Sequence, residues 1–223
     1  ALSGTGTFAC GANVVLNAAS SQVSRDGAGT ISAPLHFNAN GANLSIDANT
    51  TCSGAFTIGN NCEFEIANNV TLTKTISDIA VGTNTLVFGG VDGGTLAGRS
   101  LTFSTGTLDA NVGVTISSNI TISGNATFDI ASGKTVTYSG AAIAVGARTL
   151  AVLGTGGVGI FDNTNDIDLD DVGSLITLNR CTVGKVNQAS VNAAASKGVQ
   201  TITNAATITT FTMDATGSSS RFI

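Results

Sequence analysis

The chain has 223 residues with a net charge of −5, and only 10 % of its residues are charged. No cluster of lysine or arginine is present to neutralise a row of phosphates, so the sequence argues against nucleic-acid binding and against anionic membrane surfaces. No run approaches the roughly 18 apolar residues of a transmembrane helix. The hydrophobic fraction is 42 %, and apolar residues alternate with polar ones, which indicates a folded rather than a disordered chain.

The whole chain, residues 1–223, is predicted to form a single elongated β domain. Residues 1–40 hold weak strand patterns, with Arg25-Asp26-Gly27 as a turn. Residues 41–155 are predicted to form duplicated β-solenoid coils. Residues 156–223 contain an acidic segment and the final strands.

A tandem duplication at an offset of 64 positions is the main fold signal. Residues 62–90 align without a gap to 126–154, and 12 of these 29 positions are identical, including an Ile-Ala-Val-Gly block. The correspondence extends upstream, where Asn61 matches Asn125. Apolar positions keep a period of two, which is typical of strands with one buried face. Gly and Asn interrupt these runs where tight turns are expected.

The strands expected in the second copy are short and closely spaced. They are Val114–Ile116, Ile120–Ile122, Thr127–Ile130, Thr135–Tyr138, Ala142–Val145 and Thr149–Val152. Three such strands with their turns make about 20 residues, the size of one coil of a parallel β-helix, so the duplicated unit corresponds to about three coils. The sequence therefore predicts an all-β, right-handed parallel β-helix (β-solenoid), and a β-sandwich of short strands is the alternative.

An acidic segment follows the duplication, in Asp162-Asn-Thr-Asn-Asp166-Ile-Asp168-Leu-Asp170-Asp171. Oxygen-rich clusters of this kind suit Ca²⁺, so Asp162, Asp166, Asp168 and Asp170 are candidate calcium ligands. The segment lacks the glycine and glutamate of an EF-hand loop. The alternative is a strand with Ile167 and Leu169 inward and the aspartates outward. Beyond calcium, no cofactor is expected.

The C-terminal part contains one ambiguous segment and one clear one. Residues 187–197 allow either a short helix, with Asn187 as its N-cap and Gly198 as its stop, or a loop. The alternation in 200–214 indicates one or two final strands.

Four cysteines are candidates for disulfide bonds: Cys10, Cys52, Cys62 and Cys181. An even count in a secreted chain permits two bridges with three connectivities. The alternative is buried thiols that act as small hydrophobic side chains.

Threonine pairs separated by one residue recur along the chain, for example Thr71/Thr73 and Thr135/Thr137. Regular threonine ladders on a flat sheet can order water and bind ice. The spacing between these pairs in the sequence is irregular, which favours a general role for threonine as an outward-facing strand residue.

Segments such as Gly133–Tyr138 and Gly146–Val152 resemble coils of large bacterial surface β-helices. The filamentous haemagglutinin-like adhesins and the passenger domains of autotransporters are the nearest families. The resemblance covers roughly residues 40–155 and is one of composition and rhythm. It implies a parallel β-helix at the cell surface, and no functional residue is transferred with it.

The sequence favours a structural role over catalysis. There is no Trp, Tyr138 is the only Tyr, and basic residues are scattered, so a platform for sugar cleavage is missing. The only histidine, His36, has no nucleophile motif to serve. We therefore expect a non-enzymatic, extracellular structural protein that self-assembles into a fibre, sheath or surface layer, secreted with its signal peptide already removed. An adhesin or carbohydrate-binding module that contacts cell-surface glycans is the alternative, and a polysaccharide-degrading enzyme is the second.

Overall fold

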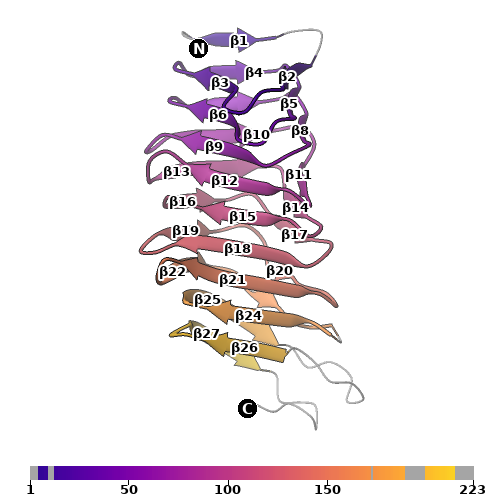
Figure 1. Ribbon diagram of the computed structural model, residues 1–223, viewed down its shortest axis with the longest axis vertical. Coiled ribbons are helices and arrows are strands. Elements are labelled where there is room, and N and C mark those ends of the chain that lie inside the picture. The colour runs from indigo at the N-terminus through magenta and orange to yellow at the C-terminus, as the bar shows by residue number, and fades with distance from the viewer. Residues whose placement is uncertain (1–4, 10–12, 172, 189–198, 214–223) are drawn as a thin grey trace.

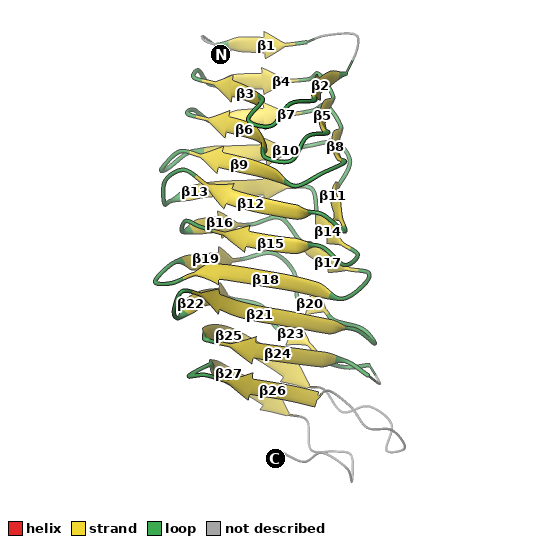
Figure 2. Ribbon diagram, viewed as in Figure 1, coloured by secondary structure: helices red, strands yellow, loops and turns green. Residues whose placement is uncertain are grey.

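The protein is a parallel β-solenoid in which the chain winds through three sheets in turn. The computed structural model describes residues 5–9, 13–171, 173–188 and 199–213, and within these residues every regular element is a strand. The strands stack along one long axis from the N-terminal to the C-terminal end (Figures 1 and 2). In Figure 1 the nearest strands run leftward and those behind run rightward as the chain descends, which makes the coil right-handed. The predicted fold is confirmed.

Each coil contributes one strand to each sheet over most of the length. Sheet 1 contains β1 (Gly6–Phe8), β4 (Gly29–Ile31), β7 (Thr50–Cys52), β10 (Thr71–Lys74), β13 (Gly94–Gly98), β16 (Val114–Ile116), β19 (Thr135–Tyr138), β22 (Gly159–Asn163), β25 (Cys181–Gln188) and β27 (Thr207–Met213). Sheet 2 contains β2 (Val14–Leu16), β5 (Leu35–Phe37), β8 (Phe56–Ile58), β11 (Ile79–Gly82), β14 (Leu101–Phe103) and β17 (Ile120–Ile122). Sheet 3 contains β3 (Gln22–Arg25), β6 (Ala42–Ile46), β9 (Cys62–Ile66), β12 (Thr85–Gly89), β15 (Thr107–Ala110), β18 (Ala126–Ala131), β21 (Thr149–Thr155), β24 (Leu175–Asn179) and β26 (Val199–Thr203). All pairings are parallel, which excludes the antiparallel sandwich that was the alternative.

The duplicated unit spans three coils, as predicted. On sheet 2, Thr57 pairs with Ala80, Ala80 with Thr102, and Thr102 with Thr121, so three coils lead from Thr57 to the residue that matches it in the second copy. On sheet 3 the three steps from Cys62 end at Phe128, two positions beyond its match, Ala126. This shift of two preserves which side chains face inward, because strand side chains alternate with a period of two.

The inward side chains of all three sheets form one continuous apolar core. Aromatic rings cross it between sheets: Phe56 and Phe64 lie with centroids 5.8 Å apart, and Phe103 and Phe128 lie 5.7 Å apart. Phe161 of sheet 1 continues the second group, 5.3 Å from Phe128. Because the core is shared, truncating an inward side chain of one sheet removes contacts from another.

Asparagine side chains join successive coils at the corners. The Oδ1 atom of Asn61 accepts a hydrogen bond of 2.8 Å from the backbone N–H of Thr85, and Asn125 accepts one of 2.9 Å from Thr149. These are equivalent positions in the two copies of the repeat. Gly82 and Gly146, the last residues of the repeated Ile-Ala-Val-Gly block, have φ of 65° and 64°. The repeat therefore preserves a corner bond and a left-handed backbone position as well as the core.

The corner between sheets 1 and 2 changes near the C-terminal end. The strands β20 (Ile143–Ala144) and β23 (Ile167–Asp168) follow the sheet 2 position but join sheet 1 through β25, which pairs with both β22 and β23. The two final strands predicted in 200–214 are present as β26 and β27. Most of the ambiguous segment 187–197 lies outside the described residues, and its first two residues, Asn187 and Gln188, end β25.

Candidate functional site

The acidic segment alternates between the core and the solvent. Ile167 and Leu169 are fully buried, whereas Asp166, Asp168 and Asp170 face outward and Asp162 is exposed. This is the strand arrangement that was the alternative to a calcium loop. Burial raises the pKa of Asp168, with a smaller contribution from the neighbouring Asp170 and Asp166, while a hydrogen bond from the Asn187 amide (3.3 Å) opposes the rise.

The geometry gives the calcium prediction no support. Within the described residues, no group of three or more His, Cys, Asp or Glu side chains is arranged to hold a metal ion. Alternate residues of an extended segment are about 6.7 Å apart, so Asp166 and Asp170, four residues apart, are separated by about twice that distance. Asp162 lies on β22, and Asp166, Asp168 and Asp170 lie on and beside β23 with their side chains directed away from the core.

The described cysteines are buried free thiols, so the disulfide prediction is not met by Cys52, Cys62 or Cys181. Burial raises the pKa of both the Cys52 and Cys62 thiols to about 12 and that of Cys181 to about 11. Thiols held in this way are poor nucleophiles at neutral pH. They act as small core side chains, and Cys10 lies outside the described residues.

Polar side chains that the sequence analysis did not place in the core stand at the ends of strands. Lys74 is 1 % exposed, its ammonium donates to the carbonyl of Ile76, and it lies 5.2 Å from the centre of the Phe56 ring. Burial lowers the pKa of Lys74. At the equivalent position of the second repeat, the hydroxyl of Tyr138 donates to Ala141 O (2.6 Å) and accepts from the N–H of Ile120 (3.1 Å).

At two further strand ends, a buried polar side chain also donates a hydrogen bond to a backbone carbonyl of a corner. Asn163 donates from its amide nitrogen to Asn165 O at 2.8 Å, and the Arg25 guanidinium donates to Gly6 O at 2.7 Å and to Ala28 O at 3.2 Å. Arg25 was predicted to lie in a turn, but it is the last residue of β3 and is 3 % exposed. The alternation of strand side chains is the signal that places Lys74 inward, two residues after Leu72. These residues bind the protein's own corners, so they stabilise the coil rather than form a reactive centre.

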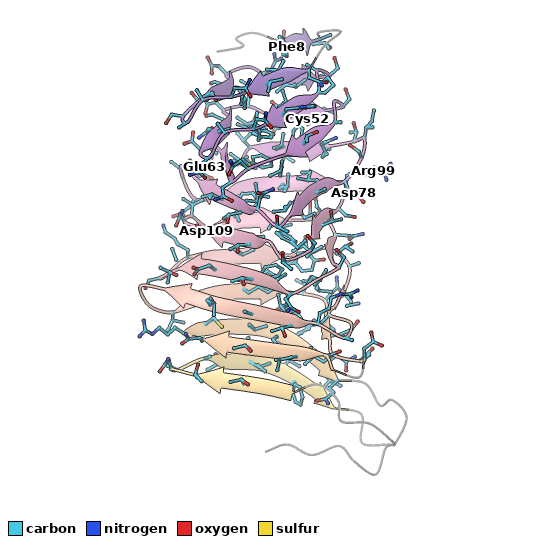
Figure 3. All side chains as sticks on the ribbon, turned by 45° about the vertical axis from the view of Figure 1, so that its right-hand side comes forward. Phe8, Cys52, Glu63, Asp78, Arg99 and Asp109 are labelled. Atoms are coloured by element: carbon cyan, nitrogen blue, oxygen red, sulfur yellow. The ribbon has the colours of Figure 1, made fainter. Side chains whose placement is uncertain are left out.

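The solvent face of sheet 3 carries a row of carboxylates. Asp109 and Asp129 are paired across neighbouring strands, and Glu63 lies on the same face (Figure 3 shows Glu63 and Asp109). Partial burial raises the pKa of Asp109, and repulsion from Asp129 adds to the rise. Partial burial also raises the pKa of Glu63, followed by repulsion from Glu65. Within the described residues, this face has no group of carboxylates arranged to hold a metal.

One ion pair bridges coils at the corner between sheets 3 and 1. The Lys134 ammonium lies 2.9 Å from the carboxylate of Asp92, which also accepts from the N–H of Gly113 at 2.6 Å. The Gly113 hydrogen bond and Lys134 lower the pKa of Asp92. His36 lies outward on sheet 2, where it pairs with Val15 and Thr57 as an ordinary surface residue.

Neither the family models, nor the curated proteins, nor the solved structures give a match to this chain. The resemblance to surface adhesins and autotransporter passengers therefore stays a prediction from the sequence. In the part of the chain that the structure describes, no helix has the length and apolar character needed to cross a membrane.

Proposed function

We propose that the chain is an extracellular structural protein that self-assembles by adding coil upon coil at its outermost strands. The observation that carries the proposal is the pair of sheet edges at the two ends of the stack. Among the described strands, β1, β2 and β3 lie at one end of their sheets, and β26 lies at the other end of sheet 3 with β24 as its single partner. β27 likewise pairs with β25 alone.

The backbone groups at these edges point along the stacking axis. Thr203 O accepts from the N–H of Arg180 in the preceding coil (3.4 Å), so the adjacent Ile202 directs its own N–H and C=O to the other side. At the opposite end, Phe8 O accepts from the N–H of Ser32 (2.9 Å), so Thr7 directs its backbone groups away from β4. A second copy can satisfy these groups with the same parallel pairing that joins the coils within one chain.

The composition of the edge strands supports the same proposal. Sheet edges in proteins are commonly protected from pairing by Lys, other charges or Pro. β26 and β27 contain no charged residue and no Pro, and Ile202 is 43 % exposed. The low charge of the chain also gives little repulsion between copies. The extracellular location is part of the proposal and is supported by the composition and the resemblance described above.

Electron microscopy of the purified chain at neutral pH tests this proposal. We expect unbranched filaments with the width of one solenoid, and a mass by light scattering that rises with concentration. Ile202→Pro removes an outward-facing N–H without removing a bond to β24, so it is expected to shorten or abolish filaments while the circular dichroism spectrum stays unchanged. Ile202→Val is the matched control and is expected to assemble normally. Monomers alone at every concentration of the unmodified chain would contradict the proposal.

A further inference from the structure

Between β4 and β19, sheet 1 presents a solvent face made almost entirely of threonine. In β4, β7, β10, β13, β16 and β19, every solvent-facing side chain is threonine except Ala97. We call this surface the threonine face; its threonines are Thr30, Thr51, Thr71, Thr73, Thr95, Thr115, Thr135 and Thr137. The neighbouring sheet 3 has carboxylates on its outer side. The threonine face therefore differs from the outer side of sheet 3 in having no charge.

The threonines are aligned in space although they are irregularly spaced in the sequence. One ladder pairs Thr7 with Thr30, Thr30 with Thr51, and Thr51 with Thr73. A second ladder pairs Thr71 with Thr95, Thr95 with Thr115, and Thr115 with Thr137. The two ladders overlap on β10, where Thr71 and Thr73 stand side by side. The irregular spacing that argued against ice binding in the sequence is therefore absorbed by the corners between the strands.

The steps of the second ladder show how this happens. The coil from Thr71 to Thr95 is longer in sequence than the coil from Thr95 to Thr115. The strands remain in register in both cases. A sequence period is consequently a poor guide to this surface, whereas strand register determines it directly.

The hydroxyl groups of these ladders are not used inside the protein. From β4 to β19, the ladder threonines make no side-chain hydrogen bond with any described residue. Corner hydroxyls behave differently: Ser32 donates to Phe8 O at 3.2 Å, Ser117 to Leu96 O at 3.3 Å, and Thr164 to Tyr138 O at 3.3 Å. The face therefore presents two staggered columns of hydroxyl and methyl groups to the solvent.

Two spacings on this face are close to those of a crystalline water lattice: the spacing between neighbouring strands, and the spacing between the two threonines of β10 and of β19. Neighbouring strands are about 4.8 Å apart, and alternate residues of one strand are about 6.7 Å apart. In a tetrahedral water network with O···O distances of about 2.75 Å, oxygens two bonds apart are separated by about 4.5 Å. The layers of hexagonal ice repeat every 7.3 Å or so, which is about eight-thirds of the O···O distance. The strand spacing exceeds the water spacing of about 4.5 Å by about 0.3 Å, so the difference over the three steps of one ladder is about 0.9 Å.

We propose that the threonine face binds ice. The β-branched threonine side chains have restricted χ1 angles, so the hydroxyl and methyl positions are fixed before binding. Water molecules held between neighbouring rungs then adopt lattice-like positions at little further entropic cost. The absence of charge avoids the hydration shells that would compete with an ordered lattice. A crystalline polysaccharide is a poorer fit, because this face has no aromatic side chain on which a sugar ring could stack.

Ice-growth measurements on the purified chain test this inference independently of filament formation. The unmodified protein is expected to lower the freezing point below the melting point and to produce faceted crystals. The pair Thr95→Lys and Thr115→Lys, in the centre of the face, is expected to lose both effects. The matched control pair Thr107→Lys and Thr127→Lys lies in register on sheet 3 and is expected to retain them.

Circular dichroism and melting temperature establish that each variant is folded. If the double variant of the face unfolds, the single Thr115→Lys variant replaces it and is expected to reduce the freezing-point gap in a folded protein. An unmodified chain that neither opens such a gap nor facets ice would overturn the inference. So would a folded Thr115→Lys variant with undiminished activity, or a control pair that loses activity to the same extent as the face pair.

Discussion

Sheets 1 and 3 share one core but differ in the charge that they present to the solvent. From β4 to β19, the outer side of sheet 1 is neutral and made almost entirely of threonines. The outer side of sheet 3 combines a threonine column, which includes Thr107 and Thr127, with carboxylates such as Asp109. Both sheets use the same parallel pairing and the same inward alternation. Stacking is therefore determined by the inward and corner residues, and the outward residues of each sheet are left to determine what that face can bind.

The largest expected effect comes from the shared core. Phe128→Ala removes a buried ring that contacts Phe103 of sheet 2 and Phe161 of sheet 1, so the damage should reach all three sheets. We expect a loss of about 3 to 5 kcal/mol in the free energy of unfolding. Urea denaturation measures it, with the outward neighbour Thr127→Ala as control. Equal losses for the two variants would contradict the division between inward and outward roles.

A corner substitution is expected to have the next largest effect. Tyr138→Phe keeps the ring but leaves the N–H of Ile120 and the carbonyl of Ala141 without their side-chain partner. The expected loss is about 1 to 3 kcal/mol, because buried polar groups then lack hydrogen bonds. Hydrogen exchange at the Ile120 amide should accelerate more than at amides of sheet 3. An unchanged exchange rate at Ile120 would show that the hydroxyl does not protect it.

The corner asparagines allow a direct comparison of the two repeats. Asn61→Ala and Asn125→Ala each remove one side-chain acceptor for a backbone N–H of the next coil. Each is expected to lower the stability by about 1 kcal/mol. Thermal melts of the two single variants should give similar shifts. A large effect at one position and none at the other would indicate that the repeat does not preserve the role of these corners.

The smallest expected effect distinguishes the acidic face from the neutral one. Because the folded-state pKa values of Glu63 and Asp109 are raised above their ordinary values of 4.5 and 3.8, the folded state holds these protons more tightly than the unfolded chain does. Stability should rise as the pH falls from 7 through the folded-state values, and the gain is complete below the ordinary values. The lowered pKa of Asp92 acts in the opposite sense. Its contribution to stability is complete above the ordinary value of 3.8 and is lost as the pH falls through the lower folded-state pKa.

Asp109→Asn tests the source of this pH dependence. It removes the repulsion from Asp129, so it should raise the melting temperature slightly at pH 7, by an amount equivalent to less than about 1 kcal/mol. It should also reduce the stabilisation gained on acidification. Thr115→Asn on sheet 1 is the control and should leave the pH profile unchanged. A pH profile that Asp109→Asn does not alter would exclude this carboxylate as a source.

Much of the fold was predictable because the strands are local and strictly alternating. Val114–Ile116, Ile120–Ile122 and Thr135–Tyr138 appear with the predicted bounds, and the duplicated unit spans three coils. The burial of Lys74 and Arg25 was missed because Lys74 was not assigned to a face and Arg25 was assigned to a turn, although the alternation of their strands turns both inward. Each side chain points into the core and donates a hydrogen bond to a backbone carbonyl of the following corner. The sequence does not show this carbonyl as a partner, because its position depends on the path of the corner in space.

The candidate sites were harder to predict because they depend on register between distant residues. The aspartates of 162–171 are close in sequence, but Asp162 lies on β22, and Asp166, Asp168 and Asp170 face outward on and beside β23. The threonines of the second ladder on sheet 1 are each separated by a whole coil of the chain and yet form a continuous row. Coil lengths vary at the corners, so residues that align in space do not align at a fixed sequence period.

We propose that copies assemble by continuing the coil stack from one chain to the next. Fibre diffraction from oriented filaments tests this most directly. Continuous end-to-end stacking predicts a reflection at about 4.8 Å along the filament axis, since that is the spacing of neighbouring strands. A reflection at this spacing perpendicular to the axis would show that the solenoids pack side by side, and it would exclude end-to-end stacking.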